Sequence, residues 1–312
     1  MTVLPVLRTQ FLSGKAKLCA HRRLFSAIAG TSEPVDLDYT LQIPQNGNTT
    51  EKPLVILHGL FGSKRNWTSL TKAFVSNLQR PIYALDLRNH GSSPHAAPMT
   101  YEHMATDVLH FFKKHKLQDV CLLGHSMGGK VAMSVALNQN STLDNEDAIS
   151  SLIVADIAPI RATLSQDFVE YIHIMSKIEQ MGLKTRSEAG KVLEEYEKDP
   201  SIRQFLLTNL VVPPASSPNK AKFQVPLSLL NESISLLGSF PYEPGNRLWQ
   251  GKTLVIKGSK SKYINRHNIP TIEAFFPDMR LEVLDAGHWV HAEKPHEFMK
   301  LVIDFIGDRD NN

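Results

Sequence analysis

The six residues 124–129, Gly-His-Ser-Met-Gly-Gly, constrain the fold of this chain more than any other stretch. They follow the apolar run 120–123, which is typical of a buried strand, and they precede residues 130–137, which begin like a helix. A serine with a glycine two positions away on each side, at a strand-to-helix turn, predicts a nucleophile elbow. The turn strains the backbone of Ser126, and a side chain at either glycine would collide with a neighbouring strand or helix. The flanking strand and helix disfavour the alternative, a chance match to the motif.

The rest of the chain supports one large α/β core. It has 312 residues, of which 42% are apolar, so a sizeable core can be buried. Short apolar runs alternate with helical periodicity, and this alternation predicts a mostly parallel central sheet with helices on both faces. The strand candidates are 35–43 at an edge, 54–57, 82–85, 120–123, 152–155, 253–256 and 281–284, and the helix candidates are 68–79, 101–115, 127–139 and 295–306.

The alternation stops at Pro159 and resumes near Gly251. Helical patterns at 168–181 and 185–198 lie between these points, and the proline- and serine-rich stretch 212–218 interrupts them. We expect a helical lid here, inserted after the sixth strand and covering the carboxyl ends of the strands, where open α/β sheets bind ligands. A helical layer away from the site is the alternative.

These boundaries predict a core in two parts, 31–159 and 250–312, separated by a lid at 160–249. The polar and acidic stretch 139–150 is interpreted as a surface loop after the elbow helix. Cys121 lies in the strand before the elbow, where we expect it to pack as a small hydrophobic residue. The chain offers no spacing of Cys and His that is typical of zinc.

Residues 1–30 contain five basic side chains and no acidic one. The net charge of +3 therefore falls to −2 without them, and the remainder gives no reason to expect nucleic-acid binding. Arg8, Lys15 and Arg22 recur every seven residues on one helical face, which is typical of a mitochondrial presequence. A mitochondrial location, in the matrix, is therefore expected. The alternative is that residues 1–30 are a disordered tail or a helix on the surface. No apolar run has the length of a membrane span.

A catalytic triad is predicted from the order serine, acid, histidine. His288 follows the last strand candidate in a glycine-bearing turn and is the predicted general base for Ser126. The segment after the strand ending at Ile256 contains no carboxylate, so Asp156, at the end of an earlier strand, is the predicted acid. Asp285 is the alternative acid. It lies only three residues before His288, which makes the contact awkward.

Other motifs near the strand ends predict supporting roles. The glycine turn after the strand at 54–57 aims backbone N–H groups at the serine, so the N–H groups of Leu60 and Met127 are the expected oxyanion hole. His58 is expected to hydrogen-bond this loop, and His291 to cap or pack near the turn. The polar stretch 86–93 is interpreted as a network that locks a loop. Gly-rich nucleotide motifs are absent, so no cofactor is expected.

With these residues in hand, the chain resembles the mitochondrial α/β-hydrolases of fungi and animals. The segments that carry the resemblance begin at His58, Asp86, Gly124 and Asp156, and read HGLFGS, DLRNHGSSPH, GHSMGGKVA and DIAP. The family includes proteins similar to α/β-hydrolase domain-containing protein 11 and the yeast ethanol acetyltransferases, with bacterial YbfF-type esterases as more distant relatives. The resemblance implies a Ser-Asp-His triad whose acid lies in the DIAP segment, and cleavage of esters and thioesters through an acyl-enzyme.

The leading hypothesis is a mitochondrial serine hydrolase that acts on a small acyl ester or an acyl-CoA thioester. An acetyl-CoA:alcohol acetyltransferase that uses the same triad and a short alcohol is the second hypothesis. Transfer to an alcohol needs an acceptor site that excludes water. A non-catalytic binding protein that keeps the fold is the third. The sequence identifies no protein partner.

Overall fold

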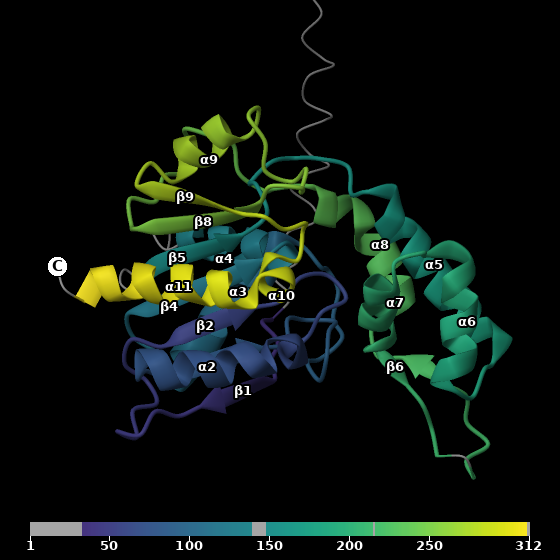
Figure 1. Ribbon diagram of the computed structural model, residues 1–312. Helices are drawn as coiled ribbons and strands as arrows, with labels where there is room; N and C mark the ends of the chain where they lie inside the picture. The colour runs from purple at the N-terminus through teal and green to yellow at the C-terminus, as the bar shows by residue number, and fades with distance from the viewer. Residues whose placement is uncertain (1–32, 139–147, 215, 311–312) are drawn as a thin grey trace, which may run out of the picture. The chain divides into compact units, whose positions relative to one another are not determined.

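A seven-stranded sheet organises the described part of the computed structural model, which comprises residues 33–138, 148–214 and 216–310 (Figure 1). Its spatial order is β1-β3-β2-β4-β5-β8-β9, and only the edge strand β1 runs antiparallel to its neighbour. The predicted strands and the mostly parallel sheet are confirmed. The strands are β1 (Tyr39–Gln42), β2 (Leu54–Leu57), β3 (Ile82–Leu85), β4 (Val120–His125), β5 (Ile149–Ala155), β8 (Thr253–Gly258) and β9 (Met279–Leu284).

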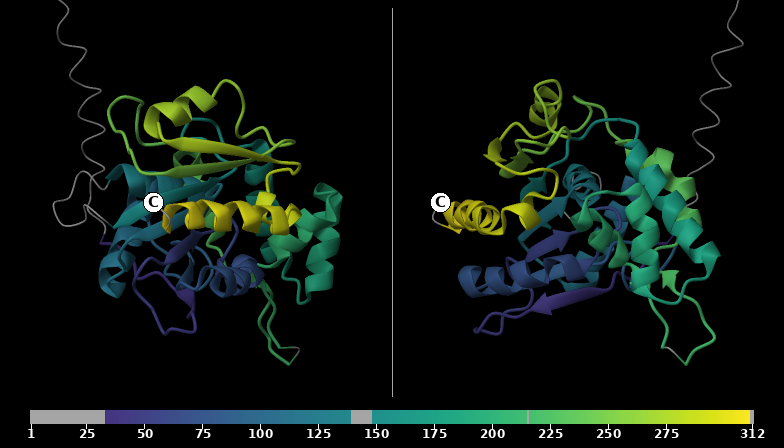
Figure 2. Two further views of the ribbon diagram at one scale, coloured as in Figure 1. Left: turned by 60° about the vertical axis from the view of Figure 1, so that its left-hand side comes forward. Right: turned by 45° about the vertical axis from the view of Figure 1, so that its right-hand side comes forward.

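Helices cover both faces of the sheet, as β2 illustrates. Leu54 and Ile56 belong to one apolar cluster and Val55 and Leu57 to the other, because successive side chains of a strand point to opposite faces. All four residues are buried, which is why this strand has no polar alternation. Helices α2 (Thr68–Leu78) and α11 (Pro295–Asp310) pack together on one face, and α3 (Tyr101–His115) and α4 (Met127–Asn138) on the other (Figures 1 and 2).

The segment between β5 and β8 forms a mostly helical layer (Figure 2). Four helices and a short hairpin make it up: α5 (Gln166–Met181), α6 (Arg186–Tyr196), α7 (Pro200–Leu207), β6 (Leu210–Val211), β7 (Lys222–Phe223) and α8 (Leu227–Gly238). Within the described residues this insertion follows the fifth strand, not the sixth, because one strand alone, β1, precedes β2 there. The remaining elements are η1 (Lys64–Trp67), α9 (Ile269–Phe275) and α10 (Val290–Glu293).

Two predicted segments lie wholly or mostly outside the described residues. The predicted presequence, 1–30, lies outside the described residues, as does most of the expected loop at 139–150. Of the loop residues that are described, Ala148 lies in a bend, whereas Ile149 and Ser150 already belong to β5, where Ile149 pairs with Val120 of β4. The strand therefore begins three residues earlier than predicted, because its first residues are partly polar. Over the described ranges, the helices are too short or too polar to cross a bilayer.

The bend between β4 and α4 has the steric character that its glycines predict. Ser126 takes a φ of 53°, in the left-handed region that a residue with a side chain rarely adopts. A Cβ atom on Gly124 would lie 2.2 Å from the carbonyl oxygen of Gly128, and one on Gly128 would lie 2.5 Å from the carbonyl oxygens of Leu57 and His58. The two glycines therefore let α4 start directly against β4 and β2, and the bend leaves the Ser126 side chain only partly covered.

We expect Gly124→Ala to destabilise the fold, because its new methyl group would overlap backbone that cannot move aside. The loss should reach or exceed the ~1–3 kcal/mol typical of overpacking. Gly307→Ala is the matched control: a Cβ there meets nothing within 4 Å, and alanine favours the α11 helix by ~0.5–1 kcal/mol. Urea unfolding measures both variants. Equal stability of the two would contradict the steric account.

Candidate active site

A continuous hydrogen-bonded chain links the three side chains predicted as a triad. His288 Nε2 lies 2.9 Å from the Oγ atom of Ser126, and its Nδ1 atom lies 2.8 Å from Oδ2 of Asp156. Ser126 follows β4, Asp156 follows β5 and His288 follows β9. Because these strands are parallel, their carboxyl ends meet at one edge of the sheet. Residues more than 130 positions apart in the sequence are thereby brought into contact.

Asp156, not Asp285, lies against the histidine. Its side chain is fully buried, and its second oxygen, Oδ1, accepts the N–H of Gly258 at 2.9 Å. The residue has a φ of 51°, which turns the chain sharply at the end of β5. Asp285 instead points to solvent and forms an ion pair with Lys260 at 2.9 Å. That lysine lowers the pKa of Asp285.

Three groups hold the His288 imidazole and its loop in place. The ring of Tyr263 lies beside it, with centroids 4.2 Å apart. The Nε2–H group of His125 donates to the backbone carbonyl of His288 at 3.0 Å. The carboxylate of Glu293 accepts the N–H of Gly287 at 2.7 Å. None of these three roles was predicted from the sequence. The contacts of Tyr263 and His125 cross between segments that follow different strands, and the contact of Glu293 joins two ends of one turn after β9.

The loop after β2 carries the N–H groups expected to form the oxyanion hole. A Cβ on Gly59 would lie 3.2 Å from the Ser126 Cβ, so this loop runs directly beside the serine. Leu60 lines the same cavity as Ser126 and Met127. Met127 opens helix α4, and the first N–H groups of a helix have no partner within it. The helix N-terminus also favours negative charge at this point.

Two buried histidines fix the shape of that loop. His58 donates its Nδ1–H to the carbonyl of Gly59 at 2.8 Å and accepts the N–H of Leu87 through Nε2 at 3.0 Å. His90 accepts the N–H of Phe61 through its own Nε2, at 3.2 Å. His58 therefore has the loop-bonding role that the sequence predicts.

The polar stretch after β3 locks the neighbouring loops, as predicted. The Asp86 carboxylate accepts the backbone N–H groups of Lys64 and Ser92, at 2.7 and 2.8 Å, and pairs with the Lys64 ammonium group. Arg88 forms a two-pronged, fully buried ion pair with Asp107, with N–O distances of 2.6 and 2.7 Å. Paired charges of this kind stay together because separating them leaves a buried charge without a partner.

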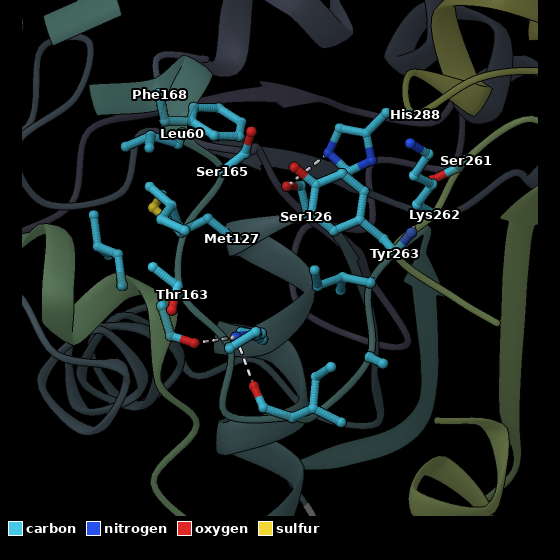
Figure 3. A pocket seen from close by; sticks show the side chains of 18 of the residues that line it. Leu60, Ser126, Met127, Thr163, Ser165, Phe168, Ser261, Lys262, Tyr263 and His288 are labelled. Atoms are coloured by element: carbon cyan, nitrogen blue, oxygen red, sulfur yellow. Dashed lines mark hydrogen bonds between the residues drawn. The ribbon is translucent and has the colours of Figure 1, made fainter. Parts of the chain in front are cut away.

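A cavity of about 560 Å³ opens beside Ser126 and His288 (Figure 3). Its wall combines Leu60 and Met127 with side chains of the inserted layer, among them Phe168 of α5. Figure 3 shows Ser126 and His288 facing each other, with Tyr263 close to the imidazole and Leu60, Phe168 and Met127 gathered to one side. The segment that joins β5 to α5 contributes several apolar members of the wall: Ile157, Ala158, Ile160, Ala162 and Leu164.

Lys130, which the sequence reasoning did not single out, ties the inserted layer to the core. It extends from α4 and donates to the carbonyl of Ile160 at 3.0 Å and to those of Gly238 and Ser239 at 3.2 Å each. Burial lowers the pKa of Lys130 to about 8. The three carbonyls belong to the two segments through which the chain enters and leaves the helical layer. One ammonium group therefore holds both segments beside the cavity.

Four buried histidines near the active site have depressed pKa values, which disfavours their charged forms. Burial lowers the pKa of His58, and lowers that of His125 well below its usual range, with help from the neighbouring imidazoles. Burial also lowers the pKa of His90 and of His291 to about 3. His291 stacks on Trp67 with ring centroids 4.3 Å apart, which is the packing role expected of it.

Comparisons with known proteins agree with this geometry. A family model described as the alpha/beta hydrolase fold matches residues 52–295. This chain belongs to the α/β-hydrolase family. It is 38% identical to the sn-1-specific diacylglycerol lipase ABHD11 of Xenopus tropicalis and 36% identical to a probable alcohol acetyltransferase of Saccharomyces cerevisiae. Each match covers 94% of this chain and 89% of the relative.

A solved structure gives the same result. An esterase from a marine microorganism superposes with a TM-score of 0.76 at 32% identity, over 87% of this chain and 99% of the esterase. With lipase, alcohol acetyltransferase and esterase relatives in this family, the chain is an enzyme of the same type, which argues against a non-catalytic binding protein. The α/β-hydrolase fold class predicted from the elbow is confirmed.

The depressed pKa of His291 predicts how stability depends on pH. Its folded pKa of about 3 lies below the ordinary 6.5, so between these values the unfolded chain binds a proton that the folded chain does not. The contribution of the neutral His291 side chain to the free energy of unfolding is complete above pH 6.5 and is lost as the pH falls toward 3. In His291→Phe we expect the free energy of unfolding to fall less steeply than in wild type as the pH is lowered. The difference between the two slopes should be about 1.4 kcal/mol per pH unit. Urea unfolding at pH 7, 5.5 and 4.5 measures this, and parallel pH profiles of the two proteins would refute it.

Proposed function

We propose that this enzyme is a mitochondrial serine hydrolase that cleaves a small acyl ester or an acyl-CoA thioester through an acyl-enzyme on Ser126. The observation that carries the proposal is the unbroken contact from Asp156 through His288 to the Ser126 hydroxyl, beside a cavity of about 560 Å³. Ester-cleaving and acyl-transferring relatives at 32–38% identity support the same class of chemistry.

Acylation uses each group of the site once. His288 Nε2 takes the proton of Ser126 while Oγ attacks the carbonyl carbon of the substrate. Asp156 accepts the Nδ1–H of His288, which sets the tautomer with a free Nε2 and stabilises the imidazolium that forms. The N–H groups of Leu60 and Met127 receive the negative oxygen of the tetrahedral intermediate. The imidazolium then gives its proton to the departing alkoxide or thiolate, and the acyl group stays on Oγ.

Deacylation reverses the acylation steps, with an acceptor molecule in the place that the leaving group held. His288 removes a proton from the acceptor, whose oxygen attacks the acyl carbon, and Ser126 leaves with that proton. Water gives a free acid, and an alcohol gives a new ester. No cofactor is needed at any step. The likeness to a probable alcohol acetyltransferase favours acyl transfer to a short alcohol as the second candidate function.

Removing members of the proposed triad should reduce turnover by different amounts. We expect Ser126→Ala to lower kcat for p-nitrophenyl acetate by about 10⁴-fold or more and to abolish labelling by a fluorophosphonate probe. Asp156→Asn should lower kcat by about 10³–10⁴-fold, because the amide cannot hold the correct tautomer. Asp285→Asn is the matched control and should stay within about threefold of wild type, because this carboxylate pairs with Lys260 at the surface. Full turnover in Ser126→Ala would rule out the proposed nucleophile.

The mitochondrial part of the proposal is based on residues 1–30, which are basic and free of acidic residues. A fusion of these residues to a fluorescent protein should enter mitochondria. Replacing Arg8, Lys15 and Arg22 by glutamate should prevent import, because it reverses the charge of the segment. Microscopy and import into isolated mitochondria measure both. A cytosolic signal from the unmodified fusion would contradict the proposed location.

A further inference from the structure

A second, much smaller chamber lies against the same serine and histidine. Its volume is about 30 Å³, compared with about 560 Å³ for the large cavity. The two share Leu60, Ser126, Phe168 and His288 and otherwise have different walls. The chamber's own wall comes from the loop after β2, the end of η1, the end of β4, helix α7 of the inserted layer, and the segment from Trp289 into α10. Its residues are His58, Gly59, Gly62, Asn66, Trp67, His125, Phe205, Trp289 and His291.

We propose that this chamber is the acceptor site of the acyl-enzyme, and that its size selects water over larger alcohols. The inference deepens the proposed function and rests on it. A volume of about 30 Å³ suits one water molecule, whereas each added CH₂ group of an alcohol needs further room. The acyl chain then occupies the large apolar cavity, and the acceptor approaches the acyl carbon from a separate compartment beside His288.

The wall of the chamber suits a small neutral molecule with a hydroxyl group. His291 is buried, and its Nδ1 atom has no hydrogen-bond partner among the described residues. Buried polar atoms in native proteins are nearly always satisfied, by protein or by ordered water. Burial lowers the pKa of this ring and those of His58 and His125, which disfavours their charged forms, so the chamber offers hydrogen bonding to a neutral molecule.

The chemistry of the step balances without any further reactant. The acceptor oxygen forms a bond to the acyl carbon while its proton passes to His288 Nε2. The bond from the acyl carbon to Ser126 Oγ then breaks, and Oγ recovers the proton from the imidazolium. The contact of 2.9 Å between Nε2 and Oγ places the base where both proton transfers occur.

Phe205 sets one wall of the chamber and is the side chain best suited to a test. It comes from α7, is only half-buried, and lines the chamber but not the large cavity. Its ring packs against that of Trp289, with centroids 6.2 Å apart. Shortening it widens the chamber without touching the triad. Ile160 is the matched control, because it lines only the large cavity.

The test is the partition of the acyl-enzyme between water and alcohols. The full-length enzyme is acylated with p-nitrophenyl acetate in buffer that contains methanol, ethanol or propan-1-ol, and the ratio of acetate ester to acetate is measured. In wild type we expect this ratio to fall steeply from methanol to propan-1-ol. In Phe205→Ala the ratio for ethanol should rise about tenfold, because removing the ring makes room for the carbon chain of ethanol and one methylene group in a pocket is worth about this factor. Ile160→Ala should leave the ratio unchanged.

A second variant covers the case in which Phe205→Ala fails to fold. Phe205→Trp fills the chamber, so it should slow deacylation and produce a burst of p-nitrophenol followed by slower turnover, with the ethanol ratio lowered. A ratio that is the same in wild type and both Phe205 variants, or that shifts equally in Ile160→Ala, overturns the acceptor chamber alone. If wild type releases no p-nitrophenol, the proposed function falls and the chamber falls with it.

Discussion

The sharp left-handed bend at Ser126 is the constraint on which the rest of the site depends. Because Gly124 and Gly128 carry no side chains, helix α4 begins in contact with the ends of β4 and β2. That contact brings the oxyanion loop beside the serine and starts the helix whose Lys130 reaches the inserted layer. The absence of a side chain at Gly124 and Gly128 therefore aligns the nucleophile, the expected oxyanion donors and the wall of the large cavity.

Burial controls the electrostatics around this bend. Burial lowers the pKa of the histidines near the triad, because the protein interior disfavours their charged form. Each then has one N–H donor and one acceptor, and His58 and His125 use them to hold the oxyanion loop and the His288 backbone. His125 lies beside His288, with ring centroids 4.8 Å apart, and the Asp156 carboxylate faces the Nδ1 atom of His288, where it stabilises the imidazolium that forms.

Much of this arrangement could be predicted from the residues. The apolar runs indicated the central strands, since β2, β3, β4, β5 and β8 are buried along nearly their whole length, and the elbow indicated the fold class. Asp156 was reached by elimination, because the segment after β8 has no carboxylate. The structure shows what that segment does instead: Gly258 donates its N–H to Asp156 and Tyr263 packs on His288. The predicted place of the inserted layer, after a sixth strand, was wrong, because five strands precede it among the described residues. The predicted start of β5 was wrong as well, because Ser150 and Ser151 make the beginning of this strand resemble a loop.

By itself the sequence determined the bend, the alternation of strands and helices, and the candidate serine, acid and histidine, because each depends on residues adjacent in the chain. Only the tertiary structure decided that Asp156 meets His288 while Asp285 faces solvent, that Lys130 joins both ends of the helical layer, and that two compartments of very different size adjoin Ser126. These features depend on strand order and on contacts between loops more than a hundred residues apart. No local pattern records such contacts, because the side chains involved meet only after the sheet has formed.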